Sequence, residues 1–168
     1  MNFAQRTTRF AVKGLSSGVL GTAAMDVVAF RRNRSGGNRE RFCSWEFSRN
    51  ALSFDDVGAP GQLGQKLAKM VRRPIEDRHA GATNNIVHWA TGLGWGLAAG
   101  VLAKRTRLSP LGAGPVTGVA AFIVSYTVLP LVGLYKPIWR YDTKALSNDF
   151  AGHLVFGVVT GMMLTSMS

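Results

Sequence analysis

Cysteine and acidic residues are scarce in this 168-residue chain, and charge is missing from long parts of it. Cys43 is the only cysteine, so no disulfide can form within the chain. The sequence also lacks the G-x-S-x-G, P-loop, H-E-x-x-H and paired-cysteine patterns that carry common hydrolytic, nucleotide-dependent and metal-dependent chemistry. We therefore expect a protein without enzymatic activity and without a bound cofactor.

Four stretches of the chain are almost free of charge. They span residues 11–30, 80–102, 110–134 and 150–167, and their only charged residues are Lys13 and Asp26. Each is long enough to cross a hydrocarbon core of about 30 Å as a helix. The sequence thus predicts one membrane domain over residues 1–168, built as an all-α bundle of four transmembrane helices.

A long polar segment, residues 31–79, separates the first two apolar stretches. Within it, apolar and basic residues alternate at helical spacing until Pro74 ends the pattern. They are Leu63, Lys66, Leu67, Lys69, Met70, Arg72 and Arg73. This pattern predicts a basic amphipathic helix over residues 62–73 that lies in the membrane interface. A short helix packed on a partner protein explains the pattern equally well, so both interpretations stay open.

Basic residues outnumber acidic ones by 20 to 9, which gives a net charge of +11. Most of them flank the apolar stretches, where anionic headgroups of membrane lipids are the simplest partners, and we expect no nucleic-acid binding. The loops 31–79 and 135–149 carry fourteen basic residues, against six in residues 103–109 and the N-terminal tail up to and including Lys13. Counting Lys and Arg places the long loop in the cytoplasm, although eight acidic residues in the same two loops weaken that preference.

Small residues and histidines recur in the apolar stretches at a spacing of four. On a helix this spacing forms one stripe, and small residues in a stripe let helix backbones approach closely in a membrane. The stripes are His88, Gly92 and Gly96; His153, Gly157 and Gly161; Gly14 and Gly18; and Gly114 and Gly118. We expect these glycines to pack helices together, either in one hairpin that is used twice or in two hairpins alike by chance.

Two further local features refine the helices. Pro130 lacks a backbone donor and should bend the third helix. Asn84 and Asn85 are residues of a type that caps helices, and they are candidates to cap the second one.

The order of the helices predicts one polar cluster inside the bundle. Asp26 lies near the end of the first helix, whereas His88 lies near the start of the second. Asp149 and His153 lie at the start of the fourth. These ends share one membrane face, so the four side chains should lie within about two helical turns of each other. Hydrogen bonds that stabilise the bundle, proton or solute handling, and axial ligation of a haem are three possible roles.

The second half of the chain carries a more specific group of residues. Phe122 to Leu129 lead into Pro130-Leu-Val-Gly-Leu, and Pro137, Trp139 and Tyr141 precede Gly152-His153-Leu-Val. In these residues, and in His88 and the Gly14-x3-Gly18 pair, the chain resembles the YagU-like family of uncharacterised bacterial inner-membrane proteins. The resemblance implies a four-helix protein of the bacterial inner (plasma) membrane, loosely linked to acid stress and without an assigned chemistry.

These observations together favour a small, non-enzymatic accessory or stabilising subunit of a larger membrane complex, such as a lipid or solute transporter. The glycine stripes and the basic amphipathic segment are suited to contacts with other membrane protein subunits. The alternative is a small transporter or proton-linked acid-stress protein that uses the Asp26, His88, His153 and Asp149 cluster. A b-type cytochrome is a third hypothesis.

Overall fold

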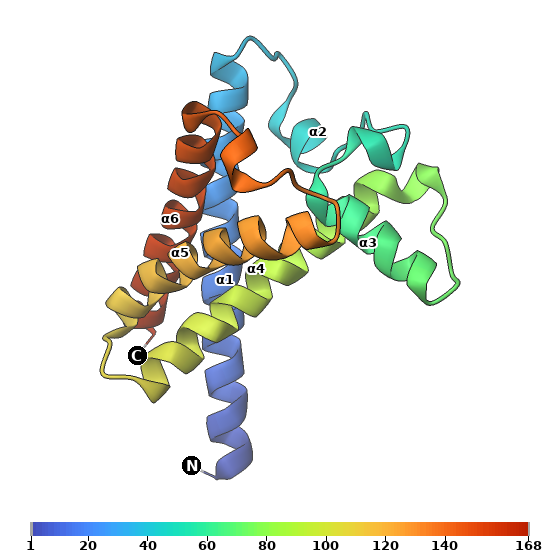
Figure 1. Cartoon of the computed structure of the whole chain (residues 1–168). Coiled ribbons are helices and arrows are strands. Elements are labelled where there is room, and N and C mark those ends of the chain that lie inside the picture. Colours follow the sequence, from blue (N-terminus) through green and yellow to red (C-terminus); the bar gives the residue numbers. More distant parts are fainter. Residues whose placement is uncertain (1, 168) are drawn as a thin grey trace.

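The computed structural model describes residues 2–167, and within them the chain is all-α, with six helices and no sheet (Figure 1). Among these residues two helical stretches, Asp77–Arg105 and Pro110–Leu131, are long and apolar enough to cross a membrane. The all-α class predicted from the sequence is confirmed.

The helices follow one another with short connections except in the first half of the chain. Their bounds are α1 Phe3–Ser35, α2 Phe42–Glu46, α3 Ala59–Met70, α4 Ala80–Arg105, α5 Pro110–Leu131 and α6 Thr143–Ser166. Three 3-10 turns, η1 Phe54–Asp56, η2 Asp77–His79 and η3 Ile138–Arg140, lie between them. The long polar loop of the sequence therefore holds α2, η1, α3 and η2.

Four long helices form the bundle. α1 packs against both α4 and α6, and α5 packs against both α6 and α4. Figure 1 shows α6 beside α1, with α4 and α5 crossing them obliquely, and the N-terminal turns of α1 projecting beyond the other helices. The short α2 and the longer α3 lie to one side, where α3 packs on α4.

Glycines bring the long helices into backbone contact. A Cβ added at Gly18 of α1 would lie 2.5 Å from the Gly92 carbonyl oxygen of α4. A Cβ added at Gly157 of α6 would likewise lie 2.5 Å from the Gly114 carbonyl oxygen of α5. Real Cβ atoms essentially never come this close, so each pair of helices touches where glycine alone fits.

The two helix pairs resemble each other without being identical. Gly18, the second glycine of its G-x3-G pair, faces Gly92, whereas Gly114, the first of its pair, faces Gly157. The α5–α6 contact is therefore displaced by one helical turn relative to the α1–α4 contact. If the fold arose from a repeated hairpin, the two helices of one copy have shifted along each other by one turn relative to those of the other copy.

The third long helix ends at Leu131 and does not continue to residue 134. Gly133 has a φ of +69°, and the Leu134 N–H donates to the Leu129 carbonyl over 2.9 Å, which is a Schellman ending. Pro130 therefore lies in the last turn of α5, and the predicted bend is replaced by the end of the helix.

The amphipathic helix begins and ends three residues earlier than the predicted range 62–73. α3 ends at Met70, and Arg72, with a φ of +56°, lies beyond it together with Arg73. The helix does not stand apart from the bundle, because a Cβ added at Gly61 or Gly64 would meet side chains of α4. Arg72 and Arg73 are thus loop residues that follow the helix.

The asparagines at the start of α4 do not cap it. His79 occupies the N-cap position. The Asn84 side chain instead accepts from the Gly61 N–H over 3.1 Å, and the Asn85 side chain donates to the Glu46 carbonyl. Both residues sit inside the helix, so their amides are available to hold the loop 31–79 against α4.

Candidate functional site

The first polar contact of the bundle joins α1 to α4. The Nε2 atom of His88 lies 2.9 Å from one carboxylate oxygen of Asp26 and 3.1 Å from the other. The Asp26 side chain is only 8% exposed, whereas that of His88 is 29% exposed. A buried carboxylate requires a donor, which His88 supplies here. The pair bridges the same two helices that the Gly18–Gly92 contact brings together.

The end of α2 adds a second carboxylate to this pair. The indole N–H of Trp89 donates to Oε1 of Glu46 over 3.0 Å. Burial, followed by the negative charge of Asp26, raises the pKa of the Glu46 carboxyl above its ordinary value. Asp26, Glu46 and His88 therefore form one electrostatically linked group.

The second histidine is held by its own helix. Nδ1 of His153 lies 3.0 Å from the backbone oxygen of Asp149 and 3.5 Å from its carboxylate. The imidazole packs edge-on against Phe122, with ring centroids 5.7 Å apart. Tyr126 lies close enough to interact with the Asp149 carboxylate, and its ring contacts Tyr135.

Tyr135 lies just beyond the end of α5 and faces the same group. Burial, followed by the charge of Asp149, raises the pKa of Tyr135 to about 12. Its hydroxyl therefore stays protonated at neutral pH and is available as a hydrogen-bond donor.

A cavity of about 410 Å³ connects the two histidines. It lies between α4 and α5, and Ala59, Pro60 and Leu63 of α3 form part of its wall. Its lining is mostly apolar, and its ionisable residues within the described part of the chain are His88, Asp149, His153 and Tyr135. Small-molecule sites commonly combine a volume of about 300–1,000 Å³ with a few converging polar groups in this way.

The four residues proposed as a polar cluster are thus arranged as two pairs around one cavity. His88, Asp149 and His153 lie on its wall, and Asp26 lies behind His88. No direct hydrogen bond links the two pairs in residues 2–167. The cavity, and not a continuous network, is what they share.

The glycines that follow the two histidines by four residues lie at helix contacts. The position that a Cβ of Gly92 would take is filled by the Thr22 hydroxyl, and that of Gly157 by the Gly114 backbone. These two glycines therefore serve helix packing. Within residues 2–167, moreover, no group of three or more His, Cys, Asp and Glu could hold a metal ion.

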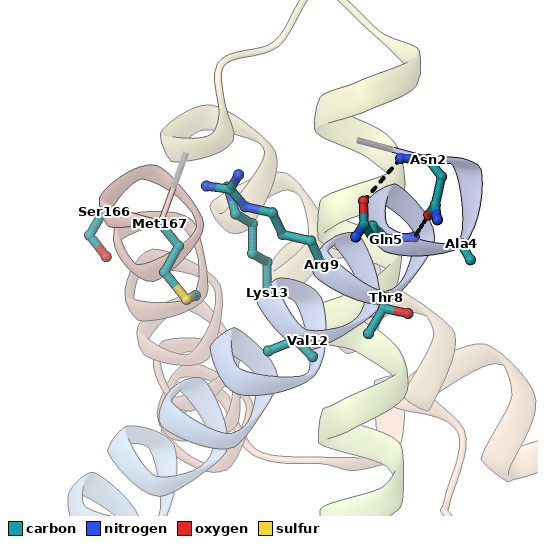
Figure 2. Close-up of a pocket in the computed structure, with 9 residues that line it drawn as sticks. All are labelled: Asn2, Ala4, Gln5, Thr8, Arg9, Val12, Lys13, Ser166 and Met167. Atoms are coloured by element: carbon teal, nitrogen blue, oxygen red, sulfur yellow. Dashed lines mark hydrogen bonds between the residues drawn. The ribbon is translucent and has the colours of Figure 1, made fainter.

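A second depression lies at the other end of the bundle, between the start of α1 and the end of α6 (Figure 2). It is open and has a volume of about 830 Å³. Figure 2 shows Arg9 and Lys13 extending from α1 toward Met167 at the end of α6. Neither cation forms a salt bridge with any residue from 2 to 167.

No family model, curated protein or solved structure matches the chain. The resemblance to the YagU-like family therefore stays a prediction that depends on the residues quoted for it.

Two residues of the site, Glu46 and Tyr135, were not predicted from the sequence. Both lie in connections whose path depends on how the loops fold back on the helices, which helical periodicity does not reveal. Glu46 has one weak signal, since it stands between Trp45 and Phe47 in a segment otherwise polar. An acidic residue between two aromatic ones is a candidate for burial at a helix surface.

Proposed function

We propose that the protein is a multi-pass protein of the bacterial inner (plasma) membrane with four spanning helices, α1, α4, α5 and α6. Two observations support this proposal. α4 and α5 are long and apolar enough to cross a membrane, and α1 and α6 contact them through glycines. Large apolar side chains, such as Val27 of α1 and Met162 of α6, are exposed on the outside of the bundle. Contact of such a surface with lipid tails has no hydrophobic cost, whereas contact with water has one.

Extraction of isolated membranes with alkaline carbonate tests this arrangement. The protein should remain in the membrane pellet, as integral proteins do. Release into the supernatant would show that fewer helices, or none, are embedded.

Within this arrangement, we propose a non-enzymatic role in which the bundle binds a small solute and exchanges a proton with it. One observation carries this proposal: two histidines, each beside a carboxylate, line the same mostly apolar cavity. Imidazoles and carboxylates inside a membrane protein are typical of proton-coupled sites. If these polar contacts served packing alone, we would expect close-packed side chains around them and not a cavity of about 410 Å³.

Purified protein in liposomes that enclose a pH-sensitive dye provides the test. A panel of cationic, anionic and neutral solutes is added outside, and proton movement is followed. At least one solute should move protons with the natural protein, and His88→Ala and His153→Ala should abolish the signal. His79→Ala is the matched control, because His79 is exposed on η2 and lies outside the cavity. The proposal fails if no solute moves protons or if both cavity variants behave like the natural protein.

A role as an accessory subunit of a larger membrane complex is a second candidate, because the outer side of the loop 31–79 is apolar and exposed. Met70 and Val71 are 79% and 70% exposed at the end of α3, next to basic residues. A partner subunit or the membrane interface would cover this surface. Native purification through a C-terminal tag should then recover another membrane protein. Recovery of the protein alone in every mild detergent would reject this role.

The basic end of the bundle suits anionic lipid headgroups as partners. Arg9 and Lys13 line an open depression there without ion pairs to residues 2–167 (Figure 2). Cations in this position attract the phosphates of a charged leaflet, at roughly 1 kcal/mol for each basic residue. The double variant Arg9→Gln, Lys13→Gln should lose the preference for anionic over zwitterionic lipid in vesicle partitioning, and an unchanged preference would contradict the assignment.

A further inference from the structure

We propose that the ligand of the cavity is an organic cation: a protonated primary or secondary amine attached to an apolar body. This inference rests on the proposed role of the cavity as a solute site and names the chemistry of the solute. It follows from the hydrogen-bonding atoms of the two histidines and from the charge of Asp149.

His153 presents a hydrogen-bond acceptor to the cavity. Its Nδ1 atom lies 3.0 Å from the backbone oxygen of Asp149. A carbonyl oxygen can only accept, so Nδ1 carries the hydrogen, and the lone pair of the neutral ring is on Nε2. Nε2 has no hydrogen-bond partner among residues 2–167, although the residue lines the cavity. A ligand at this position has to supply the donor.

His88 presents the same chemistry from the other helix. Its Nε2 atom donates to the Asp26 carboxylate, with oxygens at 2.9 and 3.1 Å. The lone pair of the neutral ring is then on Nδ1, for which no partner is found in the described part of the chain. In their neutral forms the two imidazoles on the cavity wall thus each offer one free acceptor atom.

Asp149 adds a negative charge at the wall of the cavity. Its Oδ2 atom is buried without a hydrogen bond of normal geometry to any residue from 2 to 167. The hydroxyl of Tyr126 lies within hydrogen-bonding reach of the carboxylate, and Tyr135 lies near enough to interact with its charge. The Oδ2 atom is not open to the cavity, so Asp149 contributes its negative charge to the binding of an ammonium.

The charge around the cavity also favours a cation. Among the described residues, no Lys or Arg lines it. Asp149 lies on the wall, and Asp26 lies directly behind His88. When the two imidazoles are neutral, these carboxylates repel an anionic solute and attract an ammonium.

The rest of the wall fits an apolar body attached to the ammonium. Trp95, Phe156 and Tyr135 line the cavity and offer aromatic faces, which attract cations as well as apolar groups. The apolar majority of the lining would cover the remainder of the ligand. A hydrated metal ion would gain nothing from such a surface.

Four ligands that share one phenylethyl body separate the contributions of charge and of N–H donors. They are phenylethylammonium, its N-trimethyl derivative, phenylethanol and phenylacetate. Binding to the purified protein in lipid nanodiscs is followed by tryptophan fluorescence, since Trp95 lines the cavity, and by calorimetry. Phenylethylammonium should bind roughly tenfold more tightly than each of the other three, a factor that corresponds to about 1.4 kcal/mol.

Variants then locate the site. Asp149→Asn and His153→Ala should each weaken phenylethylammonium binding by about tenfold. Asp55→Asn and His79→Ala are the matched controls, because both residues are exposed and outside the cavity, and they should leave binding unchanged. Circular dichroism checks that each variant keeps its helices, and where one does not, the four-ligand series on the natural protein decides alone.

The outcomes separate this inference from the proposed function. Binding of phenylacetate or phenylethanol as tight as that of phenylethylammonium overturns the cation assignment and leaves a solute cavity in place. Binding of none of the four, while another solute drives proton movement in liposomes, also overturns the assignment alone. Failure of both experiments overturns the assignment and the proposed function together.

Discussion

A single methyl group at Gly157 should force α5 and α6 apart. In the Gly157→Ala variant the new Cβ would lie 2.5 Å from the Gly114 carbonyl oxygen and 3.0 Å from the Cα of Pro115. Ordinary contact begins at 3.4 Å, so the closest pair has to separate by about 0.9 Å. Both neighbours are backbone atoms, which means that no change of rotamer can relieve the contact.

The size of the effect follows from comparison with a second glycine. A Cβ added at Gly94 of α4 meets nothing within 4 Å. Both substitutions gain the helix propensity of alanine over glycine, which is about 1 kcal/mol. The difference between them therefore isolates the clash at Gly157, and overpacking of this kind typically costs about 1–3 kcal/mol. Gly94→Ala should be as stable as the natural protein or slightly more stable.

Thermal or denaturant unfolding in one detergent, followed by circular dichroism, measures this difference. Gly157→Ala should unfold about 1–3 kcal/mol more easily than Gly94→Ala, and Gly157→Leu more easily still. Equal stability of the two alanine variants would mean that Gly157 does not lie at a backbone contact. The arrangement of α5 against α6 would then have to be abandoned.

Three further predictions concern the polar groups and the end of α5. Asp26→Asn replaces the charged partner of His88 and should destabilise the bundle by about 1–3 kcal/mol in the same unfolding assay. The raised pKa of Glu46 means that the folded state binds this proton more readily than the unfolded state, so stability should fall as pH rises from near 4.5 through the raised value. Glu46→Gln should remove that pH dependence while keeping an acceptor for Trp89, and an unchanged profile would exclude Glu46 as its source. Gly133→Ala should cost about 1–2 kcal/mol because of the φ of +69°, and no loss would contradict the Schellman ending.

The long helices were predictable because their signal is local. Uncharged stretches and glycines at a spacing of four are visible in the sequence. The ends of α4 and α5 and the end of α6 lie within a few residues of the expected positions, whereas both ends of α1 and the start of α6 do not. α1 extends from Phe3 to Ser35 because its polar ends are helical too, which hydropathy does not register. α6 begins at Thr143 because Asp142 caps it through the Ala145 N–H.

The site was predictable only in part. Asp26 and His88 were expected at one depth because chain order alone places them there, and the structure puts them 2.9 Å apart. The partner of His153 on its own helix follows from the spacing of four that separates it from Asp149. The cavity itself depends on the angle at which α4 and α5 cross and on where α3 lies over them. Neither leaves a periodic pattern in the sequence.

The loop 31–79 has consequences for how the chain is made. The small apolar core under it consists of Phe54, Val57 and Ala80, with Ala51 and Ile75 packed against them. Ala80 is the first residue of α4, so this core is completed by a residue that emerges from the ribosome after the loop. A peptide of residues 31–79 should therefore stay unfolded in isolation. During synthesis the loop can fold only after the start of α4 has been made.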